Sequence, residues 1–432
     1  MANTNASYQE ALEYLYTLQK FGIKFGLSKT SNLLKSLSNP QNGQKYIHIA
    51  GTNGKGSVAA ICASIFIEAG LRVGVYSSPH LVRFTERFRI NNNEITQEKV
   101  IALIDELKNV IDKSEPPTFF EAATAMAIAY FAREKTDIAI METGMGGRLD
   151  ATNVISPILC VITNISMEHQ FYLGSRLSDI AGEKGGIIKN GVDVITGATQ
   201  PGVLNVFKSI CEKKKAPLLQ VGKDIRYRLT DSGFHYYGIK HRLNRLELGL
   251  KGHFQGRNAA IALAVVEVLK EKGVEISNND IREGLKNVSW PGRMHVLGRR
   301  PDILLDGAHN PAAIRVLSAS IKTDFKYKRL ILVLGVMEDK EIGQILKGIV
   351  PLSDYVIYTR PVYPRAADPE DLMAEAAFLK KPGEAIHCLT DALDRAMEIA
   401  GPKDLIVVCG SLFTVGEAMT YFDSETYMPD NV

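Results

Sequence analysis

Residue types that bind phosphate are concentrated in residues 46–57. Residues 46–50 alternate and are rich in β-formers, which predicts a buried strand, and the apolar run that follows Ser57 is helical in pattern. Gly51, Gly54 and Gly56 lie between them and predict a tight turn. A strand, a glycine loop and a helix N-terminus gather backbone N–H groups and the positive helix end around one point, which favours an anion. Lys55 would then reach the β- and γ-phosphates of a nucleotide, and the Ser57 hydroxyl would help to hold Mg²⁺.

This segment departs from the general phosphate-loop pattern in two places. Counting back from Lys55, the position of the first expected glycine is occupied by Ile49, and Gly56 separates the lysine from the serine. An ordinary glycine turn between a strand and a helix therefore stays as the alternative to a nucleotide site.

Two further strands are expected to deliver polar side chains near the same loop. The apolar strand 137–141 ends at Glu142, and the strand 158–163 is followed by Asn164 and His169. Mg²⁺ prefers hard oxygen ligands close to the phosphates, so Glu142 is a candidate metal ligand. The alternatives are a solvated glutamate at a strand end and a structural histidine. Lys184, taken alone, reads as a surface lysine on a helix.

Two other groups of polar residues allow more than one interpretation. Asp306 and His309 follow the strand 302–305, and they could contact a nucleotide or cap the helix that begins at Pro311. Three closely spaced arginines could bind a carboxylate or lie on a solvated strand face; they are Arg83, Arg87 and Arg89. No Ser-His-Asp or Cys-His arrangement and no metal-binding Cys/His spacing has independent support.

The elements that must position these residues alternate between strand and helix along most of the chain. This order predicts an α/β fold with a mostly parallel sheet and ligands at the carboxyl ends of its strands. Residues 218–250 lack helical periodicity and suggest an antiparallel excursion, and Ser7 with Glu10 suggests a capping box before the first helix. Alternation restarts after the connector 289–293. We therefore expect a phosphate-loop domain over residues 1–295 and a smaller, Rossmann-like α/β domain over residues 296–432.

The composition is that of an ordinary globular protein. The 432 residues are 45% hydrophobic and 23% charged, with a net charge of +3, which argues against nucleic-acid or membrane partners and leaves anions to be bound locally. The five scattered cysteines suggest small core residues in a reducing compartment. No secretion signal and no membrane-spanning stretch is visible, so a cytoplasmic location is expected.

Taken together, these segments resemble the folylpolyglutamate synthase/dihydrofolate synthase family, a branch of the Mur-type ATP-dependent amide ligases. Each matching segment is weak alone, but their order and spacing across almost the whole chain make the resemblance strong. The segments are residues 51–57, 77–81, 120–121, 142–153, 164–169, 183–189, 255–259, 291–293, 306–311 and 410–412.

The resemblance implies a role for each of several residues, with ATP, two Mg²⁺ ions and a CO₂-derived carbamate on Lys184 as cofactors. The implied ATP site comprises Asn53, Gly54, Lys55, Gly56, Ser57, Asn258, Arg293, Asp306 and His309. The implied metal ligands are Ser57, Ser78, Glu142, His169 and carbamylated Lys184. The implied folate site comprises Thr118, Phe120, Asp150 and Ala151, and the implied catalytic residues are Lys55, Lys184, His169, His309 and Ser411.

The reaction implied is amide formation between L-glutamate and dihydropteroate, or the γ-carboxyl of a folyl-glutamate, through an acyl phosphate in a monomeric enzyme. Two positions depart from the family pattern. Gly186 stands where alanine is usual, and His295 stands where a glutamate usually follows Pro-Gly-Arg-Met. One rival is a Mur ligase acting on another carboxylate, although a domain of about 100 residues is then expected before the loop. The other is a non-catalytic nucleotide-binding protein or a kinase.

Overall fold

The larger part of the chain is built on an eight-stranded sheet. The computed structural model describes residues 2–22, 26–112, 114–298 and 300–430. The strand order is β4-β3-β2-β5-β1-β6-β7-β8, and the neighbours are parallel except where β3 pairs with β2 and β4. This confirms the predicted α/β class. The strands are β1 (Tyr46–Ala50), β2 (Val73–Tyr76), β3 (Phe88–Ile90), β4 (Asn93–Glu94), β5 (Ile138–Glu142), β6 (Leu159–Ile162), β7 (Asp193–Thr196) and β8 (Leu218–Gln220).

Helices cover both faces of this sheet, which is why its central strands are mostly apolar rather than alternating. Ile47 and Ile49 point into a core shared with α3 (Lys55–Glu68), α9 (Gln255–Glu271) and α10 (Asn278–Asn287). The neighbouring Tyr46 points into the opposite core. That side is covered by α1 (Ala2–Thr17), α2 (Ser28–Ser36), α4 (Gln97–Val110) and α5 (Phe119–Arg133), and farther along by α7 (Leu177–Gly185) and α8 (Pro201–Lys214).

The N-terminal region differs from the prediction. Helix α1 already begins at Ala2, so Ser7 lies inside it and the predicted capping box is wrong. A capping box is instead present at α5, where Thr118 and Glu121 cap each other. Sequence analysis also missed α2, a short helix whose Leu33 and Leu34 are buried while its other face is polar.

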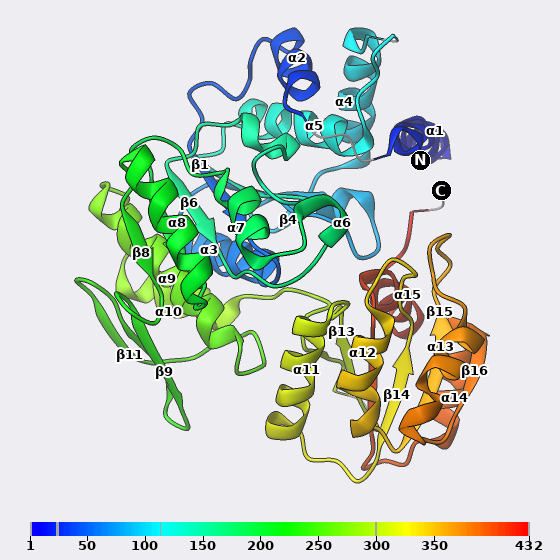
Figure 1. Cartoon of the computed structure of the whole chain (residues 1–432). Helices are drawn as coiled ribbons and strands as arrows, with labels where there is room; N and C mark the ends of the chain where they lie inside the picture. Colours follow the sequence, from blue (N-terminus) through cyan, green and yellow to red (C-terminus); the bar gives the residue numbers. More distant parts are fainter. Residues whose placement is uncertain (1, 23–25, 113, 299, 431–432) are drawn as a thin grey trace.

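The antiparallel excursion is confirmed as a separate three-stranded sheet with the order β11-β10-β9. It consists of β9 (Arg226–Thr230), β10 (Gly233–Tyr237) and β11 (Arg242–Leu246). Residues 218–220, which were predicted to belong to it, form β8 and pair in parallel with β7. Figure 1 shows this small sheet extending from the green part of the chain beside α9 and α10.

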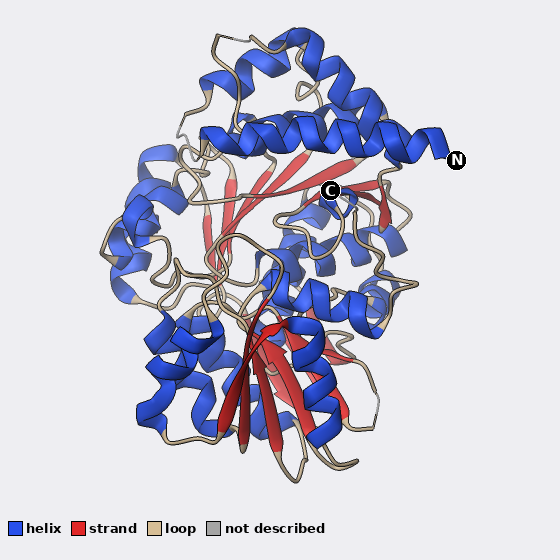
Figure 2. Cartoon of the chain, turned by 90° about the vertical axis from the view of Figure 1, so that its right-hand side faces the viewer, coloured by secondary structure: helices blue, strands red, loops and turns tan. Residues whose placement is uncertain are grey.

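A six-stranded sheet forms the core of the C-terminal part, which lies below the larger part in Figures 1 and 2. Its order is β12-β13-β17-β14-β15-β16, and only β12 is antiparallel to its neighbour. The strands are β12 (His295–Val296), β13 (Asp302–Asp306), β14 (Leu330–Leu334), β15 (Tyr355–Arg360), β16 (Gly383–Cys388) and β17 (Leu405–Cys409). Helices α11 (Pro311–Asp324), α12 (Ile342–Ile349) and α13 (Pro369–Ala376) cover one face, and α14 (Leu389–Ile399) and α15 (Leu412–Phe422) cover the other.

The end of the chain returns from α15 to the N-terminal part, as Figure 1 shows. Tyr8 donates a hydrogen bond to one carboxylate oxygen of Asp430 (3.2 Å), and the Phe84 amide donates to the other (2.6 Å). Arg83 donates to the carbonyl of Thr426 at 3.0 Å. This segment therefore ties the two parts together at a point remote in sequence from the connector.

Two predictions about composition can be compared with the fold. Four cysteines are buried core residues as expected, whereas Cys388 is exposed. Among the described residues, no helix is both long enough and apolar enough to cross a bilayer.

Candidate active site

The predicted nucleotide and metal residues meet around one cavity of about 510 Å³. It lies where β1, β5 and β6 of the large sheet end and where β13 of the C-terminal sheet ends, because parallel neighbours present their carboxyl ends at one edge. The predicted residues that line it are Asn53, Gly54, Lys55, Gly56, Ser57, Ser78, Glu142, His169, Lys184, Asn258, Arg293, Asp306 and His309. Sequence positions as distant as 53 and 309 therefore share a single cavity.

The glycine loop between β1 and α3 is held by the loop that follows β6. The Thr52 amide donates to the Asn164 carbonyl (3.0 Å), and the Asn53 amide donates to the Asn164 side chain (2.9 Å). Gly54 has a left-handed backbone with a φ of 85°, and a Cβ there would lie 2.6 Å from Asn258 Oδ1. Only glycine fits this conformation without strain. The loop thus presents the first amides of α3 to the cavity.

Lys55 and Glu142 face each other inside the cavity. Lys55 Nζ lies 3.8 Å from Glu142 Oε1 and donates to the Gly51 carbonyl at 3.1 Å. Burial raises the pKa of Glu142, although Lys55, Arg293 and a hydrogen bond from the Ser78 backbone oppose that rise. A buried carboxylate with so few direct partners is a suitable ligand for a divalent cation.

Lys184 is buried, with only 3% of the residue exposed, so its interpretation as a surface lysine is wrong. It lies near the end of α7, and its Nζ donates to the Gly51 carbonyl at 2.9 Å. Burial, helped by the nearby charge of Lys55, lowers the pKa of this amine to about 7. A substantial fraction of the amine is therefore neutral and nucleophilic at physiological pH.

Glu168, which was not predicted from the sequence, joins the two parts of the chain inside the cavity. Its Oε1 lies 3.3 Å from His309 Nε2 and accepts a hydrogen bond from Asn310 at 3.1 Å. Burial disfavours the Glu168 carboxylate, but the hydrogen bond and charge of His309 more than offset this and hold its pKa below the ordinary range. The only sequence signal was its place directly before His169.

His169 caps the short helix α6 (Gln170–Leu173) from a left-handed conformation with a φ of 50°. Burial lowers the pKa of His169 to about 4, although Glu168 opposes that effect. The imidazole is thus neutral near pH 7, as a metal-binding histidine must be. Its backbone strain is retained in a residue that lines the cavity.

The residues expected to reach across from the C-terminal part are fixed by backbone contacts. Asp306 accepts hydrogen bonds from the amides of Met294 (2.8 Å) and Ala308 (2.9 Å), and burial raises the pKa of Asp306. Arg293 directly precedes Met294 in the chain and also lines the cavity. The Asp306 carboxylate therefore holds Met294, directly after the connector, against the end of β13.

The four predicted folate residues do not line this cavity. Thr118 is the N-cap of α5, and its hydroxyl donates to Glu121 at 2.9 Å. Asp150 and Ala151 are buried at the start of a short 3₁₀ turn. Phe120 lies against Gly144, where a Cβ would come within 2.5 Å of its ring. Gly144 and Met145 do line the cavity, so these folate residues approach it through one loop.

Ser411, predicted to be catalytic, does not line the cavity either, whereas its neighbour Leu412 does. Ser411 is the N-cap of α15, and its hydroxyl accepts a hydrogen bond from the Phe413 amide at 3.0 Å. The structure therefore gives this side chain a helix-capping role.

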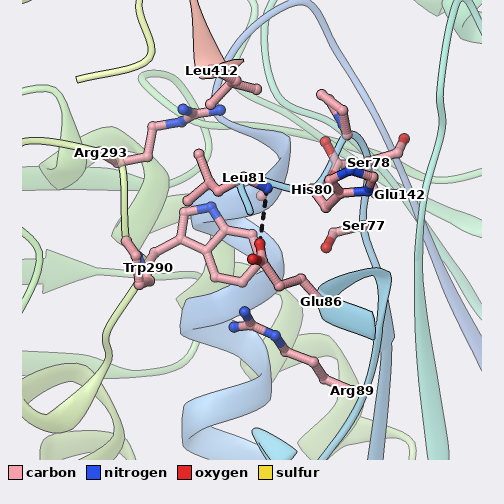
Figure 3. A pocket seen from close by; sticks show the side chains of 13 residues that line it. Ser77, Ser78, His80, Leu81, Glu86, Arg89, Glu142, Trp290, Arg293 and Leu412 are labelled. Atoms are coloured by element: carbon pink, nitrogen blue, oxygen red, sulfur yellow. Dashed lines mark hydrogen bonds between the residues drawn. The ribbon is translucent and has the colours of Figure 1, made fainter. Parts of the chain in front are cut away.

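A smaller pocket of about 40 Å³ adjoins the main cavity beside Glu142 and is drawn in Figure 3. Arg89 lies on one wall with its guanidinium 5.4 Å from the Trp290 ring, and Glu86 accepts the Leu81 amide at 2.8 Å. The interpretation of the three arginines as one solvated strand face is wrong. Arg87 is buried, and its Nε donates to His80 Nδ1 at 2.9 Å.

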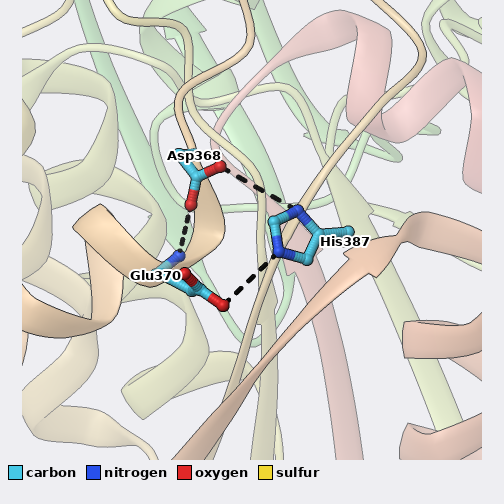
Figure 4. Close-up of side chains that lie close together, drawn as sticks. All are labelled: Asp368, Glu370 and His387. Atoms are coloured by element: carbon cyan, nitrogen blue, oxygen red, sulfur yellow. Dashed lines mark hydrogen bonds and ion pairs between the residues drawn. The ribbon is translucent and has the colours of Figure 1, made fainter.

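One other cluster of potential metal ligands occurs in the described residues, and none of its members lines the cavity. Asp368, Glu370 and His387 lie together on the surface of the C-terminal part, as Figure 4 shows. His387 Nδ1 faces Asp368 at 3.9 Å, whereas its Nε2 faces Glu370 at 3.6 Å. Glu370 and His387 are exposed and Asp368 is half-buried, so we describe the cluster as a set of surface ion pairs.

Comparisons with known proteins match both parts of the chain. Residues 49–266 match the Mur ligase middle domain, and residues 292–412 match the Mur ligase glutamate ligase domain. The chain is 32% identical to the dihydrofolate synthase/folylpolyglutamate synthase of Bacillus subtilis, over 95% of this chain and 98% of that protein.

Solved structures show the same likeness. The structure of Escherichia coli FolC in complex with DHPP and ADP has a TM-score of 0.89 and 32% identity, covering 96% of this chain and 98% of that one. A bifunctional folylpolyglutamate synthase/dihydrofolate synthase with Mn, AMPPNP and L-glutamate bound has a TM-score of 0.85 and 30% identity, covering 95% and 98%.

Proposed function

Because the chain belongs to the folylpolyglutamate synthase/dihydrofolate synthase family, it is an ATP-dependent ligase, and we propose which of its residues perform each step. The reaction joins L-glutamate to dihydropteroate, to the γ-carboxyl of a reduced folyl-glutamate, or to both. The cavity between the two sheets is proposed to hold ATP and the reacting groups. One observation carries this proposal: the predicted nucleotide residues and the predicted metal residues all line that cavity.

The triphosphate of ATP is proposed to lie against the glycine loop. The amides that begin α3 and the Lys55 ammonium would bind the β- and γ-phosphates, since helix N-termini and lysines favour anions. Lys55 is engaged with the Gly51 carbonyl and Glu142 in this structure, so it would turn toward the phosphate on binding. The remaining nucleotide contacts are assigned to Asn53, Asn258, Arg293, Asp306 and His309.

The donor set of the cavity fits two Mg²⁺ ions. Ser57, Ser78 and Glu142 offer hydroxyl and carboxylate oxygens beside the loop, and His169 and Lys184 offer an imidazole and, after reaction with CO₂, a carbamate. Lys184 is suited to carbamylation because burial lowers the pKa of its amine to about 7. The ions, when bound, neutralise phosphate charge and orient the carboxylate of the acceptor.

The residues of the chain then act in two steps. A folate or pteroate carboxylate oxygen attacks the γ-phosphorus, ADP leaves, and an acyl phosphate forms; Lys55 and the loop amides neutralise the transferring group. The L-glutamate amine attacks the acyl carbon, loses a proton, and phosphate leaves. Glu168 and His309 would hold the two parts of the chain closed and exclude water from the acyl phosphate.

The folate is proposed to bind along Phe120 and the loop from Gly144 to Ala151. Thr118, Phe120, Asp150 and Ala151 are proposed to border the folate, and Ser411 is proposed to help place L-glutamate from the start of α15. We place the domain boundary between His295 and Val296, inside the short strand β12. The enzyme is proposed to be a monomer.

A coupled assay of ADP release tests the function. We expect ADP release to require L-glutamate together with either dihydropteroate or tetrahydrofolyl-glutamate, and the two folates assayed separately report which reaction is performed. ADP release with neither folate would favour a nucleotide hydrolase or switch. Release that needs a different carboxylate would favour another Mur-type ligase.

A further inference from the structure

A buried histidine lies at the start of a hydrogen-bonded chain that ends in the proposed folate loop. His48 is in the middle of β1 and has no exposed surface. Its Nε2 is 2.8 Å from the Thr152 hydroxyl, and that hydroxyl lies 2.5 Å from Asp150 Oδ1. The three side chains join the central strand to the turn at residues 150–154. None of them lines the ATP cavity.

The hydrogen bonds of this side-chain network have a defined donor-to-acceptor direction, from His48 to Asp150. The Asp150 carboxylate can only accept, so the Thr152 hydroxyl uses its one proton to donate to it. The hydroxyl then has only lone pairs to offer His48, and the imidazole must donate from Nε2–H. His48 Nδ1 is left buried without a hydrogen-bond partner among the described residues.

Asp150 in turn holds the loop that approaches the cavity. It accepts hydrogen bonds from the amides of Thr152 (3.0 Å) and Met145 (2.8 Å), and Gly144 contributes a further backbone donor. Gly144 lies directly against the Phe120 ring. Four donors of the protein therefore converge on the Asp150 carboxylate. Asp150 stabilises the conformation of this loop.

We propose that His48 is a positioning residue for the folate: through Thr152 and Asp150 it fixes the loop 143–153 against Phe120 and so sets folate affinity. This inference rests on the proposed function of that loop. A histidine is a costly choice for a central strand whose neighbours are apolar, because an imidazole with one unpartnered nitrogen loses hydration that nothing replaces. The hydrogen-bonded chain that begins at His48 is a functional reason to retain a histidine here despite that cost.

The imidazole stays neutral over the whole range in which enzymes are assayed. Burial, together with the charge of the nearby Lys189, lowers the pKa of His48 to about 3. Neutral His48 keeps the Nε2–H donor that the direction of the chain requires. The chain is therefore a fixed support and not a switch.

Paired substitutions at both ends test the proposal. His48→Leu and Thr152→Val remove the donor and the hydroxyl at nearly constant volume, whereas His48→Gln and Thr152→Ser retain them. His48→Leu loses one buried hydrogen bond and Thr152→Val loses two. We expect the KM for the folate to rise roughly three- to tenfold in His48→Leu and at least as much in Thr152→Val, with the KM for ATP within about twofold. The second pair should stay close to wild type.

Two further measurements separate positioning from simple loss of stability. The double variant His48→Leu/Thr152→Val should show no greater rise in KM than Thr152→Val alone, because Thr152→Val already breaks the link to His48. Ile47→Val, next to His48 but in the opposite core, serves as the control that loosens β1 without touching the chain. It should leave the folate KM unchanged.

Hydrogen exchange distinguishes failure of this inference from failure of the proposed function. Amides of residues 143–153 should exchange faster in His48→Leu than in wild type or Ile47→Val, whatever the substrate is. Additive KM effects, or equal exchange in His48→Leu and Ile47→Val, would overturn the positioning role. Wild-type protein that releases no ADP with either folate would overturn the function alone.

Discussion

Glu168 and His309 meet across the interface between the two parts of the chain, with Oε1 3.3 Å from Nε2. Asn310 donates to the same carboxylate oxygen at 3.1 Å, and Asn310 and Asn53 exchange side-chain hydrogen bonds at 3.0 and 3.3 Å. The contact therefore links the loop after β6, the glycine loop and the loop after β13. Closure of the cavity and placement of its nucleotide residues depend on the same few groups.

We expect Glu168→Gln to weaken this closure. The amide keeps the size and one acceptor of the carboxylate but removes the charge that faces His309. Hydrogen bonds to charged groups contribute about 1.5–3 kcal/mol, so kcat/KM for ATP should fall by roughly tenfold or more. Steady-state kinetics measure the fall, and small-angle X-ray scattering should show a larger radius of gyration.

The control for this variant is Glu341→Gln. Glu341 also bridges the two parts, accepting a hydrogen bond from Gln170 at 2.9 Å, but both side chains are exposed. Exposed polar contacts contribute little, so its kinetics should match wild type. Equal losses in the two variants would mean that Glu168 has no special part in closure.

The proposed carbamate on Lys184 predicts a dependence on pH and on CO₂. Only the neutral amine reacts with CO₂, and burial lowers its pKa from an ordinary value near 10.5 to about 7. The neutral fraction therefore rises with pH through about 7 instead of through 10.5. Carbamylation, followed by ¹³C NMR of protein equilibrated with ¹³CO₂, should have a midpoint close to pH 7.

Two lysine substitutions complete this test. Lys184→Arg retains a cation that cannot be carbamylated, so it should lose the carbamate signal and nearly all turnover. Lys213→Met changes an exposed lysine that lies in the last turn of α8, as Lys184 lies in the last turn of α7. It should alter neither the carbamate signal nor turnover. Wild-type turnover in Lys184→Arg would remove the carbamate from the mechanism.

The positions of strand-end residues could be predicted from sequence because parallel sheets follow simple rules. β1 begins and ends where expected, and Glu142 and Asp306 come at strand ends that open into one cavity. An apolar run fixes a buried strand, and the residue after it must then lie at the carboxyl edge. The residues on the nucleotide side of the site can therefore be predicted from the sequence alone.

Residues whose environment is built by distant segments could not be predicted in this way. Lys184 stands among polar and glycine residues that resemble a helix surface, and it is buried only because its Nζ reaches Gly51, 133 residues away. Glu168 gains its partner from a loop 141 residues later. The burial of Arg87 depends on His80 and on the Phe119 ring, 5.1 Å from its guanidinium. The local sequence pattern around a residue does not show which distant segments will contact it.

The glycine loop offers a test of nucleotide binding. Gly54→Ala would place a Cβ 2.6 Å from Asn258 Oδ1 and force alanine into a left-handed conformation, which costs about 1–2 kcal/mol. We expect ADP affinity, measured by calorimetry, to fall by at least about tenfold, since both the loop amides and Asn258 must shift.

Gly70→Ala supplies the matched control for strain alone. Gly70 follows the other end of α3 and has a similar φ of 80°, but nothing lies within 4 Å of its would-be Cβ. It should lower the melting temperature about as much as any left-handed alanine while leaving ADP affinity intact. Equal affinity losses in both variants would show that backbone strain, and not contact with the nucleotide site, is responsible.

A buried carboxylate outside the site should dominate the attachment of the three-stranded sheet. Glu267 on α9 accepts the Tyr236 hydroxyl at 2.8 Å and the backbone amides of Ile239, Lys240 and His241. Glu267→Gln turns an amide group toward these donors, so at least one of them loses its acceptor. The free energy of unfolding in urea should fall by about 1–3 kcal/mol.

Glu271→Gln, one helical turn later, removes only an exposed ion pair with Lys240 and should lower the free energy of unfolding by less than about 0.5 kcal/mol. Similar losses in the two variants would show that α9 holds the small sheet by apolar packing alone.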